Sequence, residues 1–182
     1  MAASREPVLI LTGAPGSGKT TVARLLAKRA HRAVHLESDC FFHFIAKGYV
    51  DPWRPESHDQ NTTVMRIVGE VAVRYAQAGY WTIVDGIIIP GWFFEPLRDS
   101  IRGSGFEAAY AVLRPPRSVA VERAASRRSR ALSEPAVVEQ LWEALSDLGA
   151  LEHHAIEISE RQNAERTAGL VAERFEAGSL TT

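Results

Sequence analysis

The segment VLILTGAPGSGKT, residues 8–20, decides the fold of this chain. Its first five residues are apolar or β-branched and predict a buried strand, and residues 13–20 match the pattern G-x-x-x-x-G-K-[ST] in full. A helix is predicted over residues 19–30, so the motif has the strand before it and the helix after it that a phosphate-binding loop requires. Such a loop turns backbone N–H groups and the positive end of a helix dipole toward phosphate oxygens.

The motif predicts a site for ATP or GTP together with Mg²⁺. In this pattern the lysine, Lys19, reaches the β- and γ-phosphates, and the hydroxyl of Thr20 ligates Mg²⁺. The guanine-reading pattern Asn-Lys-x-Asp is absent, because neither Asn61 nor Asn163 precedes a lysine, and this disfavours a GTPase switch. We expect the nucleotide to contact the loop and the first helical turn at Gly13, Pro15, Gly16, Ser17, Gly18, Lys19, Thr20 and Thr21.

The composition is that of an ordinary globular domain, with 182 residues, 46% hydrophobic, 24% charged and a net charge of −1. We expect a single domain over residues 1–182, and the balanced charge argues against a nucleic-acid partner bound through bulk electrostatics. No apolar run approaches the roughly 18 residues of a membrane-spanning helix, and residues 1–7 lack the pattern of a signal peptide. Cys40 is the single cysteine, which excludes a disulfide framework, so we expect a cytoplasmic protein. The oligomeric state is not indicated.

Short apolar runs alternate with longer helical stretches along the whole chain. Five strands with interleaved helices predict a doubly wound α/β domain built from parallel βαβ units. We expect residues 176–182 to fray. The predicted strands are residues 8–12, 33–37, 81–85, 106–113 and 154–158, and the predicted helices are 19–30, 57–78, 92–101, 116–128, 135–148 and a last one that ends near Phe175.

An acidic residue, Asp85, closes the third predicted strand and precedes Gly86. Ligands of parallel sheets gather at the carboxyl ends of strands, so this carboxylate is placed to hold Mg²⁺ together with Thr20. The alternative is a turn-forming Asp-Gly pair. The adjacent His153 and His154 fall on a predicted strand, where neighbouring side chains point to opposite faces, so we do not expect a joint metal site there.

Asp39 follows the second predicted strand, again at a carboxyl end. A kinase that phosphorylates an alcohol benefits from a carboxylate that accepts the hydroxyl proton and orients the oxygen, and Asp39 is our candidate for that catalytic role. Glu37 is a weaker candidate, because it lies further back along the strand. The alternative for Asp39 is the N-cap of a short helix that begins near Phe41, and one residue can serve both roles.

Aromatic residues follow the second and third predicted strands. Phe42, Trp53 and Trp92 are our candidates for the walls of an acceptor pocket, because pockets for small organic ligands are mostly apolar with a few fixed polar groups. Arg54 is the candidate for a polar contact to the acceptor. The alternatives are that the aromatic side chains belong to the core and that Arg54 is a solvated surface residue.

Arginines are concentrated after the fourth predicted strand. Arg123 and Arg127 are four residues apart and share one face of a helix, from which they can stabilise charge on the migrating phosphoryl group. We therefore predict a small arginine-rich lid at about residues 127–148, with Arg127 as a catalytic residue and both arginines on the nucleotide. The alternative is a solvated basic patch.

The nucleotide base is placed, from position alone, near Ser159 in the loop after the fifth strand.

Together these motifs resemble small P-loop kinases, in particular the chloramphenicol phosphotransferase-like and shikimate/gluconate kinase-like proteins and the zeta-toxin-like kinases. The resemblance implies a P-loop NTPase fold with a five-stranded parallel sheet in the order 2-3-1-4-5, flanked by helices and carrying a lid. It also implies Asp39 as the acceptor base and lid arginines on the phosphates. This sequence differs from shikimate kinases in two places. It has Glu37 where they carry a second aspartate, and it lacks their glycine-rich turn after the third strand, since Gly86 is followed by Ile87. The aromatic residues favour a bulkier, less polar alcohol, such as an antibiotic or another natural product.

The sequence therefore predicts a phosphotransferase that moves the γ-phosphoryl group of ATP or GTP to a hydroxyl of a small-molecule acceptor. One alternative is a nucleotide, sugar-nucleotide or polynucleotide kinase. Another is a regulatory protein that binds ATP without transferring its phosphoryl group.

Overall fold

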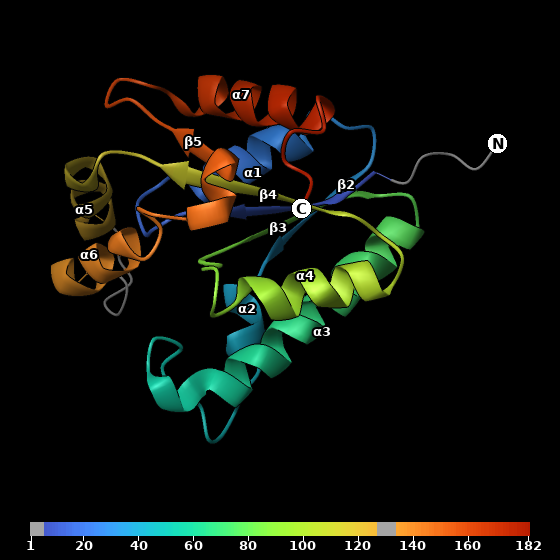
Figure 1. The fold of residues 1–182 in the computed structure, drawn as a ribbon, viewed down its shortest axis with the longest axis horizontal. Coiled ribbons are helices and arrows are strands. Elements are labelled where there is room, and N and C mark those ends of the chain that lie inside the picture. The colour runs from blue at the N-terminus through green and yellow to red at the C-terminus, as the bar shows by residue number, and fades with distance from the viewer. Residues whose placement is uncertain (1–5, 127–133) are drawn as a thin grey trace.

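The computed structural model describes residues 6–126 and 134–182 and shows a sheet between two layers of helices (Figure 1). Within these residues the sheet has five parallel strands in the order β2-β3-β1-β4-β5, which confirms the fold class and the strand order implied by the resemblance. The strands are β1 (Val8–Thr12), β2 (Ala33–Glu37), β3 (Trp81–Gly86), β4 (Ala108–Arg114) and β5 (Ala155–Glu157).

Helices cover both faces of the sheet. Figure 1 shows α3 and α4 on one face, α1 and α7 on the other, and α5 beside α6 beyond the carboxyl end of β4. No helix of the described residues is long and apolar enough to cross a membrane. The helices are α1 (Lys19–Ala27), α2 (Asp39–Phe42), α3 (His58–Gln77), α4 (Phe94–Gly103), α5 (Arg117–Ala125), α6 (Pro135–Glu143) and α7 (Ala164–Glu176), with two short 3-10 helices, η1 (Pro55–Ser57) and η2 (Gly149–His154).

The central strand β1 is buried on both faces, as its unbroken apolar sequence predicts. Side chains alternate along a strand, so Val8 and Ile10 join the core beneath α3 and α4. Leu9 and Leu11 join a second core beneath α1 and α7. The phosphate-binding motif thus begins from a strand that both cores hold in place.

The carboxyl ends of β1, β2 and β3 meet at one edge of the sheet. Thr12 pairs with Gly86 across β1 and β3, and Glu37 pairs with Asp85 across β2 and β3. The buried Thr12 hydroxyl also accepts a hydrogen bond of 2.8 Å from the amide of Ile88, which fixes the start of the loop after β3. This edge collects the segments in which the sequence places the nucleotide and the acceptor.

The structure corrects the expectation for His153 and His154, which lie in η2 rather than on a strand. η2 begins at Gly149, which has a positive φ of 53°. The strand β5 that follows has three residues, which pair with residues 112–114 of β4. The two imidazole rings are neighbours, with centroids 4.0 Å apart, instead of lying on opposite faces.

The prediction that residues 176–182 fray is also wrong. Leu180 is fully buried in the core beneath α1 and α7, and its carbonyl accepts a hydrogen bond of 2.8 Å from the amide of Tyr110. The amide of Thr182 donates to the carbonyl of Ala108 at 2.9 Å. β5 leaves the first half of β4 without a neighbour on that side, and the terminal residues take that place.

The buried imidazole of His154 makes the stability of this fold dependent on pH. His154 is 1% exposed against the Tyr110 ring, and its Nδ1 meets no hydrogen-bond partner among the described residues. Burial, with help from the nearby His153, lowers the pKa of His154 from 6.5 to about 4. Between these two values the unfolded chain binds a proton that the folded chain does not, so stability falls as the pH falls through this range.

From pH 7 to pH 5, we expect the unfolding free energy of the wild type to fall by up to about 2 kcal/mol more than that of His154→Leu. Urea denaturation at the two pH values measures the difference, and His58→Gln, which alters an exposed histidine, is the control. Equal losses in the wild type and in His154→Leu would show that His154 is not the group responsible.

Candidate active site

The phosphate-binding loop, residues 13–20, is held against α5 by a close backbone approach. Gly16 has a φ of 83°, in the left-handed region that favours glycine. A Cβ at this position would lie 2.1 Å from the carbonyl oxygen of Ala120 in α5. Within the loop, the amide of Ser17 donates to the carbonyl of Ala14 at 3.0 Å, and the buried Ser17 hydroxyl has no partner among the described residues. A bound phosphate would supply oxygen acceptors for such a group.

A polar cavity of about 150 Å³ lies in front of this loop. It brings together five predicted site residues from four places in the sequence: the phosphate-binding loop, the start of α1, the start of α2 and the end of β3. The lining residues are Pro15, Lys19, Thr20, Glu37, Asp39, Asp85 and Ile87. Glu37 also forms an ion pair of 3.0 Å with Arg24 of α1, on the rim. The candidate ligands of Mg²⁺, Thr20 and Asp85, and the candidate base Asp39 thus line one cavity at the carboxyl ends of the strands, as we expected from the sequence.

Asp85 has the environment of a metal-binding carboxylate. Its side chain is 3% exposed, and Oδ2 lies 3.1 Å from Nε2 of His35 on β2. Oδ1 is buried without a hydrogen-bond donor in the part of the chain that the structure describes. A carboxylate oxygen that lacks a donor, in a cavity shared with the Thr20 hydroxyl, fits Mg²⁺, which prefers oxygen ligands. Among the described residues no group of three or more acidic, histidine or cysteine side chains could hold a metal ion, so Mg²⁺ here would also need oxygen atoms of the bound phosphates.

Asp39 stands at the junction of two cavities. It begins α2, two residues earlier than the sequence indicated, and its carboxyl group lines both the polar cavity and a larger apolar one. The residue remains accessible to solvent, yet the protein atoms crowded around its carboxyl group raise its pKa above 3.8. Lys19 opposes this shift and Asp85 adds to it. A raised pKa makes the carboxylate a better proton acceptor.

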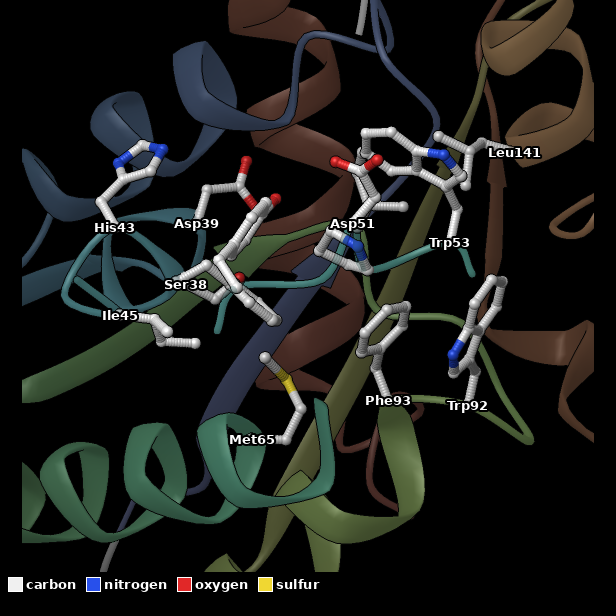
Figure 2. Close-up of a pocket in the computed structure, with 14 residues that line it drawn as sticks. Ser38, Asp39, His43, Ile45, Asp51, Trp53, Met65, Trp92, Phe93 and Leu141 are labelled. Carbon is white, nitrogen blue, oxygen red and sulfur yellow. The ribbon is translucent and has the colours of Figure 1, made fainter. Parts of the chain in front are cut away.

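The apolar cavity has a volume of about 630 Å³ and opens beside Asp39 (Figure 2). Three predicted acceptor residues, Phe42, Trp53 and Trp92, line it. Arg54 does not line it, but lies outside with its Nε 3.4 Å from Oδ2 of Asp51. Other lining residues were not predicted from the sequence, among them Tyr49, Asp51, Met65 and Leu141.

Side chains at the start of α3 hold the loop that carries Tyr49, Asp51 and Trp53. Gln60 bonds both the amide and the carbonyl of Val50, at 2.9 and 2.7 Å. The carbonyl of Pro52 accepts from Ser57 and from Asn61. The side chains of Ser57 and Asn61 are fully buried, so these two groups are shielded from water, whereas Gln60 is half-buried.

A third cavity, of about 280 Å³, lies on the other side of the phosphate-binding loop. Five predicted nucleotide residues line it, Thr21 and Arg123 together with three residues of the loop. Ser159 lies in the sequence between Ile158 and Gln162, which also line it. This is where the sequence places the nucleotide base. The remaining lining residues are Gly16, Ser17, Gly18, Val22, Asn163, Ala164 and Thr167.

The predicted lid is described in part. Arg127 and the first residues of the lid, up to 133, lie outside the described residues. The rest of the lid holds α6, which is tied to α5 by an ion pair of 2.5 Å between Arg117 and Glu139. The indole N–H of Trp142 donates to the carbonyl of Pro115 at 2.9 Å.

Comparisons with known proteins agree with this fold. The family model AAA_33, described as an AAA domain, matches residues 8–151. A cytidylate kinase from Pyrobaculum calidifontis is 32% identical over 93 residues, which is half of this chain and half of that relative. A sugar kinase from Janibacter sp. HTCC2649 has a similar structure, with a TM-score of 0.66, 23% identity and coverage of 97% of this chain and 98% of the other. The tunicamycin resistance protein of Deinococcus radiodurans has a TM-score of 0.70 at 18% identity, covering 93% and 95% of the two chains.

The approach of the loop to α5 predicts different costs for two glycine substitutions. Gly16 and Gly18 both have a positive φ, so alanine at either position is strained by about 1 kcal/mol. An added Cβ at Gly18 meets nothing within 4 Å, whereas at Gly16 it collides with backbone. We expect Gly16→Ala to lower the unfolding free energy by about 2 kcal/mol more than Gly18→Ala, as measured by urea denaturation. Equal losses of unfolding free energy in the two variants would mean that α5 moves away from the added methyl group at no cost in stability.

Proposed function

The chain belongs to the AAA_33 family of small P-loop kinases, and from that premise we propose that it moves the γ-phosphoryl group of ATP or GTP to a hydroxyl of a small organic acceptor. One observation carries the proposal: Asp39 lines both the polar cavity at the phosphate-binding loop and the apolar cavity beside it. A hydroxyl held in the apolar cavity would meet the terminal phosphate next to this carboxylate. We propose a cytoplasmic location on the composition alone.

The donor half of the site consists of the phosphate-binding loop, Lys19, Thr20 and Asp85. Loop amides and Lys19 would bind and orient the β- and γ-phosphates. Lys19 and Thr20 line the polar cavity, and the loop residues Gly16, Ser17 and Gly18 line the third cavity. Thr20 and Asp85 would hold Mg²⁺, which when bound neutralises charge on the phosphate oxygens. Arg123 faces the third cavity beside the loop, and we propose that Arg127 joins it over the phosphates.

The acceptor half begins at Asp39. The carboxylate accepts the proton of the attacking hydroxyl and aims the oxygen at the phosphorus, and its raised pKa suits that task. Phe42, Trp53 and Trp92 supply apolar walls, and the cavity of about 630 Å³ has the size of a site for a drug-sized molecule. An antibiotic or another natural product is therefore the acceptor class that we propose.

One comparison supports a second candidate. The relative from Pyrobaculum calidifontis is named a cytidylate kinase, so a nucleotide acceptor is the alternative. The aromatic walls could stack a base, but the described lining of the apolar cavity offers no arginine or lysine for the phosphate of a nucleotide.

We expect Asp39→Asn to lower phosphoryl transfer by about 10²–10⁴-fold, because it removes the proton acceptor without changing the size of the side chain. The acceptor is first found by incubating the protein with Mg²⁺ and ATP or GTP against hydroxylated antibiotics, nucleosides, sugars, nucleotides and short RNA. Mass spectrometry detects the gain of one phosphoryl group. Asp59→Asn is the matched control, because Asp59 is an exposed aspartate in α3 outside both cavities at Asp39.

Nucleotide binding, measured by calorimetry, is expected to persist in Asp39→Asn. Transfer at the wild-type rate in this variant would remove Asp39 from the mechanism. Tight nucleotide binding by the wild type, with slow hydrolysis and no phosphorylated product from any acceptor, would favour a regulatory protein that binds ATP without transfer.

A further inference from the structure

The walls of the apolar cavity carry negative charge. Two carboxylates, Asp39 and Asp51, line it together with the imidazole of His43, and no lysine or arginine of residues 6–126 and 134–182 does so. Figure 2 shows both carboxylates toward the same end of the cavity, with Met65 and Phe93 at the opposite end. Both carboxylates thus lie at one end of the cavity, where Trp53 and Leu141 also lie, and apolar side chains form the other end.

The charge of Asp51 is only weakly compensated. Arg54 is its ion-pair partner at 3.4 Å, but the Arg54 side chain is 62% exposed, and such pairs contribute little. Burial raises the pKa of the Tyr49 hydroxyl, which also lines this cavity, and the nearby Asp51 and Asp39 raise that pKa further. An anion entering this cavity would meet the carboxylate of Asp51 and that of Asp39, whose charge Lys19 of the adjoining polar cavity partly offsets. Beside apolar walls such electrostatic interactions are stronger than in water.

We propose that this cavity, taken as the acceptor site of the proposed function, binds an alcohol with a positively charged nitrogen and an apolar body, and that Asp51 selects the charge. The cation would pair with the Asp51 carboxylate and meet the faces of aromatic side chains such as Trp53 and Trp92, which attract cations. The apolar body would fill the end at Met65 and Phe93. The reactive hydroxyl would lie at Asp39.

The test compares three probes of one shape and different charge: the cationic phenylalaninol, the neutral phenylpropanediol and the anionic phenyllactate. Each carries a phenyl group and a hydroxyl, and binding is measured by calorimetry without nucleotide. We expect the full-length protein to bind phenylalaninol at least 10-fold more tightly than phenyllactate. The ratio of these affinities should fall about 5–10-fold in Asp51→Asn and rise in Arg54→Gln, which removes the partial compensation.

Asp59→Asn, outside the cavity, should leave the ratio unchanged. Phenyllactate bound as tightly as phenylalaninol, an unchanged ratio in Asp51→Asn, or no measurable binding of any probe would overturn the proposal. Binding is measured without phosphoryl transfer, so failure of the kinase proposal is recognised separately, by the absence of phosphorylated product when probes do bind.

A separate contact carries a second inference. His35 lies on β2 behind the polar cavity, and its Nε2 is 3.1 Å from Oδ2 of Asp85, while Oδ1 has no protein donor among the described residues. The neighbouring strands fix both backbones, since residue 37 pairs with residue 85. We infer that His35 is a positioning residue that holds one oxygen of Asp85 so that the other faces the metal position.

Binding of Mn²⁺ with a non-hydrolysable ATP analogue, followed by electron paramagnetic resonance, tests this role. His35→Ala should weaken Mn²⁺ binding about 3–10-fold and leave metal-free nucleotide binding unchanged, and His35→Gln, which keeps a donor, should restore part of the loss. His31→Ala, at an exposed histidine, is the control. Wild-type Mn²⁺ affinity in His35→Ala, or an equal loss of metal-free nucleotide binding, would overturn the inference.

Discussion

The parallel pairing of β1 with β3 and of β3 with β2 is the constraint on which the rest of the molecule depends. Both faces of β1 are buried, so a one-residue slip against β3 would send each β1 side chain to the opposite face and disrupt the packing of both cores. The register of β1 against β3 sets Thr12 beside Gly86, and the register of β2 against β3 sets Glu37 beside Asp85. The segments that follow these strands therefore emerge at a single edge, and the polar cavity forms there from residues that are far apart in sequence.

The two halves of the site have different supports. The donor half rests on the sheet edge and on the approach of Gly16 to α5. The acceptor half rests on α3, through the bonds that Gln60 and Asn61 make to the preceding loop. In both halves main-chain groups are fixed by buried contacts, which preorganises the side chains that the loops present.

Much of this arrangement follows from sequence patterns. The glycine motif, the apolar strands and the rule that ligands gather at carboxyl ends were sufficient to predict that Lys19, Asp39 and Asp85 meet. Tyr49 and Asp51 were not predicted to line a cavity, because side-chain bonds to the backbone shape their loop and leave no periodic signal. The ordered terminal residues were missed for a similar reason, since their place depends on how little of β4 is covered by β5.

The polar and apolar cavities share just Asp39 and Ile87 among their described lining residues. Most substitutions in the loop before α3 would alter the apolar cavity and leave the phosphate-binding residues in place. Selection on that loop could therefore exchange one substrate for another without rebuilding the machinery that handles the nucleotide. The nucleotide-binding residues of the polar cavity could thus stay constant while the residues that line the apolar cavity change.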